Sequence, residues 1–329
     1  MRKRFFCAVG FCERKKCSYG SKGLIYSKAS VIIVSKLKFR DYYKQRHLKN
    51  GGKTMKIKIL GTAAAEGVPG LFCTCERCER ARRLGGKEIR TRSQTLVDGK
   101  LLIDFSADTY LHVLRDGLPL HEIKHCLISH PHMDHLYSED FAMRGKGFAT
   151  LNEEDAFHVY GAIDTLEICR SKRESRNVLA QGRVKLHEVS LFSPFEVMNY
   201  TVTPLEADHD VGGAVIYLIS DGEKTMLYGH DTGYFTEATW EYLEKTGVKL
   251  DFVSLDCCYA LKECRREHMG IDACREVADR LTQIGAVDKN SVLCLNHFSH
   301  NVILSYEEML TAAQEKGFIL SYDGIEIEV

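Results

Sequence analysis

Four side chains that can ligate a metal ion crowd into one short stretch of this sequence. Residues 129–136 read SHPHMDHL, which places His130, His132, Asp134 and His135 within six positions, directly after an apolar run. Neutral imidazole nitrogens and carboxylate oxygens are ligands that zinc, manganese and iron accept. Because a turn at a strand end can direct several side chains at one point, the stretch predicts a metal site.

One such turn cannot complete two coordination shells, so further ligands are expected after other apolar runs. His209 in EADHD, Asp231 in YGHDTG and His297 in CLNHFSH all meet this condition. Asp208 and His230 are rival ligands by adjacency. We expect these two residues to orient the ligands at most, because a ligating imidazole commonly needs a carboxylate or carbonyl to orient its other nitrogen.

A cysteine group forms the second constellation. Cys73, Cys75 and Cys78 follow EGVPGLF with the spacing Cys-x-Cys-x-x-Cys. Three thiolates and one further ligand would make a closed zinc shell, which is typical of structural sites. Buried or free thiols are the alternative interpretation.

Taken in order, these residues resemble the metallo-β-lactamase superfamily over essentially all of residues 55–329. The resemblance implies an α/β fold, an αββα sandwich with a dinuclear site between its two sheets. It also implies the ligand sets: His130, His132 and His209 for one metal, Asp134, His135 and His297 for the other, and Asp231 as the bridge.

The cysteine motif after GT…GVP is similar to that of one subgroup, phosphoribosyl 1,2-cyclic phosphate phosphodiesterase of phosphonate breakdown. In that subgroup the fourth zinc ligand lies three positions beyond the last active-site histidine, as His300 does beyond His297. The resemblance therefore implies a structural zinc held by Cys73, Cys75, Cys78 and His300. It also implies a proton donor at His268, for which a surface histidine at a helix start is the alternative.

These residues predict a metal-dependent hydrolase, most simply a phosphodiesterase. Two divalent ions (manganese, zinc or iron) would bring the pKa of a bridging water to about 7, and the resulting hydroxide would attack a small, cyclic or linear, phosphodiester. His268 would protonate the leaving group as general acid, with Asp134 as the second catalytic residue. A small phosphodiester is the expected partner, without membrane or nucleic acid, and a homodimer stays open.

Two other classes of function remain as alternatives. Another hydrolase of the same superfamily would act on a thioester, a lactam or RNA, since a fold does not choose its substrate. A nucleic-acid-binding module would use the cysteine group as a zinc finger and the basic N-terminus as its grip. Salt-dependent retention on DNA or RNA that is lost without residues 1–54 would favour the module, whereas metal-dependent cleavage of bis(p-nitrophenyl) phosphate favours the enzyme.

Strands and helices that could position these residues follow from periodicity. We predict strands within residues 55–62, 123–130, 157–161, 184–190, 200–210, 213–220, 224–233 and 252–258, and a hairpin over residues 93–106 with its turn at Asp98-Gly99. Amphipathic patterns predict helices within residues 108–118, 236–247, 269–285 and 305–317. The predicted strands and helices follow one another along the chain, and no proline-rich linker divides them into separate domains. This order favours a single α/β sandwich.

Composition sets the remaining bounds. The 329 residues are 44% hydrophobic and 27% charged, without an apolar run long enough to span a membrane. Thirteen cysteines without a convincing signal peptide indicate a reducing cytoplasm. Residues 1–54 hold 15 Lys and Arg against 2 acidic residues. Because NGGKTM precedes a strand pattern, we interpret this segment as a disordered basic extension or a start codon assigned too early, with Met55 as the true start and residues 55–329 as the hydrolase domain.

Overall fold

A computed structural model describes residues 53–152, 154–302 and 304–329 of the chain. The prediction for the basic segment 1–54 therefore lies outside the described residues, apart from its last two positions. The described residues group into one compact unit, and this unit contains every residue that the sequence singles out for chemistry.

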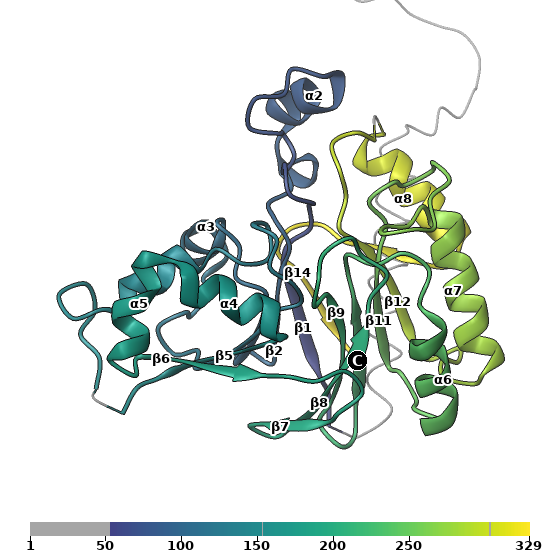
Figure 1. Cartoon of the computed structure of the whole chain (residues 1–329). Coiled ribbons are helices and arrows are strands. Elements are labelled where there is room, and N and C mark those ends of the chain that lie inside the picture. The colour runs from purple at the N-terminus through teal and green to yellow at the C-terminus, as the bar shows by residue number, and fades with distance from the viewer. Residues whose placement is uncertain (1–52, 153, 303) are drawn as a thin grey trace, which may run out of the picture. The chain divides into compact units, whose positions relative to one another are not determined.

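Two seven-stranded mixed sheets form the centre of this unit (Figure 1). The first has the order β14-β1-β2-β3-β4-β5-β6 and the second the order β13-β12-β11-β10-β9-β8-β7. The strands of the first are β1 (Lys56–Gly61), β2 (Gln94–Val97), β3 (Leu101–Ile103), β4 (His125–Leu127), β5 (Phe157–Gly161), β6 (Val184–Glu188) and β14 (Ile325–Glu328). Those of the second are β7 (Phe195–Val197), β8 (Tyr200–Glu206), β9 (Val215–Ser220), β10 (Thr225–Gly229), β11 (Phe252–Asp256), β12 (Val292–Asn296) and β13 (Ile319–Leu320).

Helices cover the outer face of each sheet. The first sheet carries α3 (Thr109–Asp116), α4 (Ile163–Ser171), α5 (Arg173–Ala180) and the short 3₁₀ segment η2 (Ser138–Arg144). The second carries α6 (Glu237–Thr246), α7 (Ile271–Gln283) and α8 (Tyr306–Glu315). Outside both layers, α2 (Glu76–Leu84) and the 3₁₀ segment η1 (Gly86–Glu88) follow β1 (Figure 1).

Three apolar layers hold the sandwich together. Residues such as Ile57, Val202 and Tyr217 fill the space between the sheets. Trp240 and its neighbours pack the second sheet against α6 to α8, and Phe157 and its neighbours pack the first sheet against its helices. Burial of these side chains is the main favourable term in folding, and it fixes where the strand ends meet.

The predicted αββα sandwich is confirmed, together with the strands and helices predicted from periodicity. The predicted hairpin joins β2 and β3 antiparallel. Asp98 and Gly99 both have positive φ, 48° and 72°, as a type I′ turn requires. Among the described residues, no helix is long and apolar enough to cross a membrane.

Candidate metal centre

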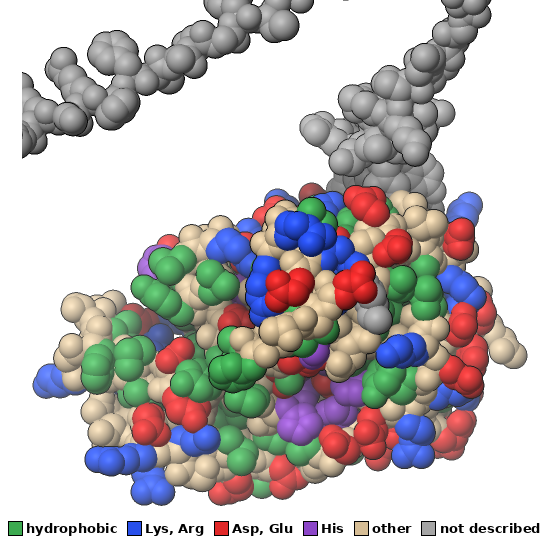
Figure 2. Space-filling view, turned by 90° about the horizontal axis from the view of Figure 1, so that it is seen from above, with side chains coloured by type: hydrophobic (Ala, Val, Ile, Leu, Met, Phe, Trp, Pro, Cys, Tyr) green, Lys and Arg blue, Asp and Glu red, His purple; other side chains and the backbone are tan. Residues whose placement is uncertain are grey.

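The candidate ligands converge at one edge of the two sheets. His130 to His135 follow β4, His209 follows β8, Asp231 follows β10 and His297 follows β12. β8, β10 and β12 run in the same direction, because β10 and β12 are both parallel to β11 and β8 is separated from β10 by one antiparallel strand. Their carboxyl ends therefore meet, and Figure 2 shows histidine side chains gathered in a hollow of this face.

Three histidines form the first group. His132 Nδ1 lies 3.1 Å from His130 Nε2 and 3.2 Å from His209 Nε2. The ring of His130 is buried, and the rings of His132 and His209 are partly buried. The resemblance implied this set for one metal ion, and the structure brings its three nitrogens together.

The second group combines imidazoles with carboxylates. His135 Nε2 and His297 Nε2 are 3.4 Å apart and lie 2.8 Å and 3.0 Å from Asp231 Oδ2. Asp134 Oδ2 lies 3.3 Å from His135 Nε2. The other oxygen of Asp231 faces the first group, 3.8 Å from His209 Nε2. Asp231 thus stands between the two groups, as a bridging ligand would.

Both groups fit a divalent cation. With metal–nitrogen bonds of about 2.05 Å and tetrahedral angles, two ligand atoms are about 3.3 Å apart, close to the separations between these imidazole nitrogens. Asp231 Oδ2 is buried and accepts no hydrogen bond from the described residues, although two imidazole nitrogens lie beside it. Nitrogens and oxygens gathered around a shared point are the donor set that a cation needs.

The protonation of the histidines differs between the groups. Burial lowers the pKa of His130, and the adjacent His135 lowers it further, so the ring is neutral and offers a lone pair. Burial also lowers the pKa of His209. Burial alone would lower the pKa of His135 and His297 too, but Asp231 and other carboxylates outweigh it and raise both. The carboxylates around the second group thus favour positive charge at these two rings, and a bound cation could supply that charge in place of protons.

Two buried carboxylates orient the ligands from behind, and sequence reasoning assigned neither of them a role. Asp104 Oδ2 accepts hydrogen bonds from His135 Nδ1 and Tyr228 Oη, each at 2.7 Å. Asp256 Oδ2 lies 3.1 Å from His297 Nδ1. In each pair Nδ1 faces a carboxylate and Nε2 is left for the centre, which is the usual arrangement of a ligating histidine.

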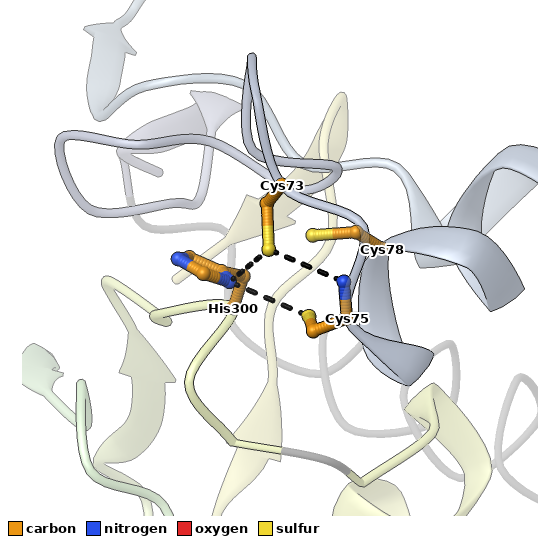
Figure 3. A group of neighbouring side chains, drawn as sticks. All are labelled: Cys73, Cys75, Cys78 and His300. Carbon is orange, nitrogen blue, oxygen red and sulfur yellow. Dashed lines mark hydrogen bonds between the residues drawn. The ribbon is translucent and has the colours of Figure 1, made fainter.

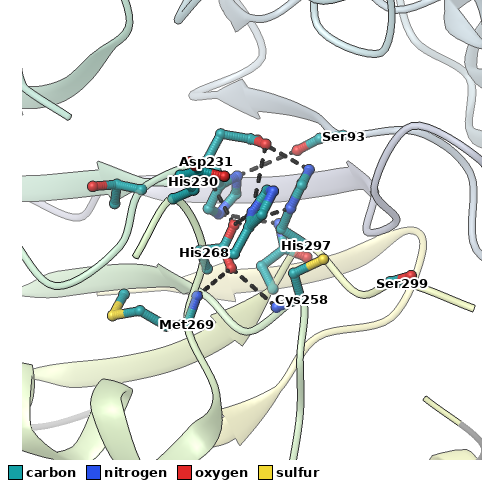
Figure 4. Close-up of polar contacts among 12 residues, drawn as sticks. Ser93, His230, Asp231, Cys258, His268, Met269, His297 and Ser299 are labelled. Carbon is teal, nitrogen blue, oxygen red and sulfur yellow. Dashed lines mark hydrogen bonds and ion pairs between the residues drawn. The ribbon is translucent and has the colours of Figure 1, made fainter. Parts of the chain in front are cut away.

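His268 lies beside the centre, where the resemblance placed the proton donor. Its Nδ1 is 2.9 Å from Asp256 Oδ2, and its ring is nearly parallel to that of His297, at an angle of 13° (Figure 4). It lines a cavity of about 710 Å³ together with His132, His209 and Asp231. Burial lowers the pKa of His268, but Asp256 and Asp231 raise it overall.

The two rival ligands face elsewhere. His230 is buried, with Nδ1 3.3 Å from Ser93 Oγ and Nε2 2.7 Å from Ser254 Oγ, so serine hydroxyls occupy both nitrogens. The carboxylate of Asp208 accepts from Arg266 Nε at 2.9 Å. Neither side chain belongs to a group of candidate ligand atoms.

The cysteine cluster is a separate centre. Cys73, Cys75, Cys78 and His300 offer ligand atoms that all lie within 4.8 Å of one another (Figure 3). His300 Nδ1 is 3.4 Å from Cys73 Sγ and 3.6 Å from Cys75 Sγ. Burial raises the pKa of the Cys75 thiol, but hydrogen bonds from His300 and the backbone of Cys78 lower it to about 6. The four donors expected for structural zinc are thus together, and a thiolate is available among them.

Two facing sheets flanked by helices, with a histidine and aspartate centre at one edge, define a metallo-β-lactamase fold. Residues 100–298 match the beta-lactamase superfamily domain family, and the chain belongs to this family. It is therefore a metallo-β-lactamase superfamily hydrolase, which confirms the class predicted from the ligand motif.

Curated relatives are distant. The chain is 27% identical over 280 residues to an octanoyltransferase from Porphyromonas gingivalis, covering 83% of this chain but only about half, 51%, of that protein. It is 27% identical over 235 residues to the coenzyme PQQ synthesis protein B of Methylobacterium radiotolerans, covering 67% of this chain and 71% of the relative.

Solved structures share the fold at low identity. A diphosphatase from the PhnP family aligns with a TM-score of 0.62 and 22% identity, over 84% of this chain and 98% of the other. Zn²⁺-bound PqqB from Methylobacterium extorquens aligns with a TM-score of 0.61 and 18% identity, over 83% of this chain and 100% of the other. At such identities the likeness concerns the fold alone.

Proposed function

We propose that this protein is a dinuclear metal-dependent phosphodiesterase that acts on a small phosphodiester, cyclic or linear. One observation carries the proposal: two groups of ligand atoms meet at Asp231, and His268 lies beside them in the same cavity. His130, His132 and His209 would hold one divalent ion, manganese, zinc or iron, and Asp134, His135 and His297 the other. Cys73, Cys75, Cys78 and His300 would hold a structural zinc.

Divalent cations bound at such a centre activate water for attack at neutral pH and offset negative charge that develops on a phosphoryl oxygen. The chain's own residues would orient the ligands and donate the proton. Asp104 and Asp256 hold His135 and His297 in the orientation that directs Nε2 at the centre. His268 has its Nδ1 on Asp256, so that Nε2 is the atom available to protonate a leaving oxygen.

The charge of the cavity favours a small substrate. Acidic side chains on its wall outnumber the single lysine, Lys262; they are Glu66, Asp134, Asp210, Asp231 and Glu267. Two divalent cations would bring four positive charges and roughly balance this wall. A diester with one negative charge suits such a site, whereas a long polyanion such as RNA needs a broad basic surface.

The decisive experiment compares leaving groups. The chain is purified, its metals are counted, and turnover is measured with bis(p-nitrophenyl) phosphate, diphenyl phosphate and cyclic diesters. His268→Gln should lower turnover of diphenyl phosphate about a hundredfold and that of bis(p-nitrophenyl) phosphate far less, because p-nitrophenolate leaves without a proton. An equal loss with both substrates would contradict the donor role. Hydrolysis of a thioester or lactam, but of no diester, would contradict the phosphodiesterase itself.

A further inference from the structure

The backbone turn that carries His268 is seated on the segment that carries the ligand His209. This turn, residues 265–268, belongs neither to a helix nor to a strand. Tyr234 N donates to Arg265 O at 2.8 Å, and His209 Nδ1 lies 3.3 Å from Glu267 O. Because the carbonyl can only accept, His209 donates from Nδ1, which leaves Nε2 for the metal centre.

Asp208 makes the most contacts to this turn. Its Oδ2 accepts from Arg266 Nε at 2.9 Å and from Glu267 N at 3.3 Å, and its Oδ1 lies 3.2 Å from the same Arg266 nitrogen. Asp208 is itself fixed, because its backbone N donates to Thr232 Oγ1 and its carbonyl accepts from Gly233 N, both at 2.9 Å. A rigid carboxylate therefore holds the turn through a charged side chain and a backbone amide.

The contact is close enough to require glycine on the opposing segment. A Cβ on Gly233 would lie 2.4 Å from Arg265 O, 2.4 Å from Asp208 Oδ2 and 2.8 Å from Glu267 N. Two backbone atoms of the turn and the Asp208 carboxylate leave no room for such a carbon. The turn, Asp208 and Gly233 thus form one packed unit.

The turn should shift if the contacts from Asp208 are lost. Glu267 has a φ of 64°, a conformation that costs a non-glycine residue energy and persists only where the surroundings enforce it. On the far side of Glu267, His268 meets Asp256 and its ring packs edge-on against His209, with centroids 5.2 Å apart. A shift of the turn would therefore displace His268 and also remove the acceptor of His209 Nδ1.

We propose that Asp208 is a positioning residue, which seats the turn 265–268 and thereby places His268 beside the metal centre. The inference rests on the proposed function only for the role of His268; the seating itself is a property of the fold. Asp208 lies next to a candidate ligand in the sequence, but its carboxylate faces the turn and not the centre.

The test separates seating from catalysis by two measurements on the purified full chain. Limited trypsin digestion, followed by mass spectrometry, reports cleavage after Arg265 and Arg266, the two sites inside the turn. Turnover of diphenyl phosphate against bis(p-nitrophenyl) phosphate reports proton donation. The variants are Asp208→Ala, Asp208→Glu, Gly233→Ala, and Asp279→Asn as the control, because Asp279 pairs with Arg275 on α7, outside the turn.

Asp208→Ala and Gly233→Ala should both speed cleavage in the turn about tenfold, since a lost charge-assisted hydrogen bond or a steric clash unseats it. Both should lower turnover of diphenyl phosphate about tenfold more than that of bis(p-nitrophenyl) phosphate. Asp208→Glu should restore part of the loss, and Asp279→Asn should match the wild type. In the Asp208→Ala/His268→Gln double variant the first change should add little.

Each contrary result has one meaning. Unchanged cleavage in both Asp208→Ala and Gly233→Ala would overturn the seating. Faster cleavage with an equal loss on both substrates, or with losses that add to those of His268→Gln, would overturn the positioning role. If the wild type hydrolyses no diester at all, the proposed function fails, while the digestion still decides whether Asp208 holds the turn.

Discussion

The two candidate metal clusters of this chain differ in where they lie and in what supports them. In the histidine and aspartate cluster, His130, His135 and Asp231 are 4% exposed or less, at the ends of strands from both sheets. In the cysteine cluster, Cys78 is buried, but Cys75 is exposed and Cys73 is partly exposed, on a loop and helix outside both sheets. The first cluster is thus built by the core, and the second lies apart from it.

This difference suggests that a bound ion would have a different role in each cluster. Buried carboxylates lie against two imidazoles of the first cluster, and its ligands stand at the ends of packed strands. The loop of the second cluster has few such supports: Gly70 N donates to Cys78 Sγ at 3.1 Å and Arg82 Nη2 donates to Gly70 O at 3.2 Å. An ion in the first cluster would mainly serve chemistry, and one in the second would mainly stabilise α2 and its loop.

Asp231→Asn should give the largest effect on activity. The variant keeps the size of the side chain but removes the charge that faces both groups of ligands. Turnover of bis(p-nitrophenyl) phosphate should fall about a thousandfold, or about 4 kcal/mol, because the metal pair loses its shared anion. Glu326→Gln, on the distant strand β14, is the control and should be silent. Near-normal turnover with two bound ions would refute the bridging role.

Cys78→Ser should act mainly on structure. The bound zinc should fall by about one ion per chain, and the unfolding temperature should drop, while turnover falls only about tenfold. Metal analysis, calorimetry and turnover measure the three quantities. Cys169→Ser is the matched control, because Cys169 is equally buried in α4 but belongs to no group of candidate ligands. If this variant and Asp231→Asn lose activity alike, the proposed division of labour is wrong.

The ligands of both clusters could be predicted because each carries a short-range signal. Four residues of the first cluster share one turn, three cysteines share a short motif, and His209, Asp231 and His297 each follow an apolar run. Strand periodicity places most of these ends, and the resemblance to the superfamily supplied the ligand sets and His300. The family and the sandwich followed from the same signals and are confirmed by the family match and the sheets.

The supporting residues could not be predicted, since their partners are distant in sequence. Asp104 meets His135 only because β3 pairs in parallel with β4, with Ile103 opposite Leu127. A lone aspartate after a hairpin carries no spacing that reveals this neighbour. Helix α2 was missed for another reason: its sequence ERCERARRL has few apolar residues, and a buried ion pair between Arg77 and Glu88 helps hold it instead of an apolar face.

Glu66 contacts residues of one cluster and lines the cavity of the other, and its substitution has the smallest expected effect on turnover. Its carboxylate accepts from Ser299 Oγ and lies 3.6 Å from His300 Nε2, while the same side chain lines the cavity of the first cluster. Since Nδ1 of His300 faces the thiols, Glu66 stands where a carboxylate would orient a zinc-ligating imidazole.

Glu66→Gln keeps the length of the side chain and an acceptor for Ser299 but removes the charge behind His300. Zinc should pass to a chromogenic chelator about tenfold faster than in the wild type, while turnover of bis(p-nitrophenyl) phosphate changes by no more than about twofold. Glu79→Gln, which breaks an exposed ion pair with Arg82 on α2, should change neither rate. Unchanged zinc release would show that Glu66 does not support the cysteine cluster. A loss of turnover as large as that of Asp231→Asn would instead assign Glu66 to the catalytic centre. The two clusters would then share a functional residue, which would contradict the proposed separation of a catalytic centre from a structural one.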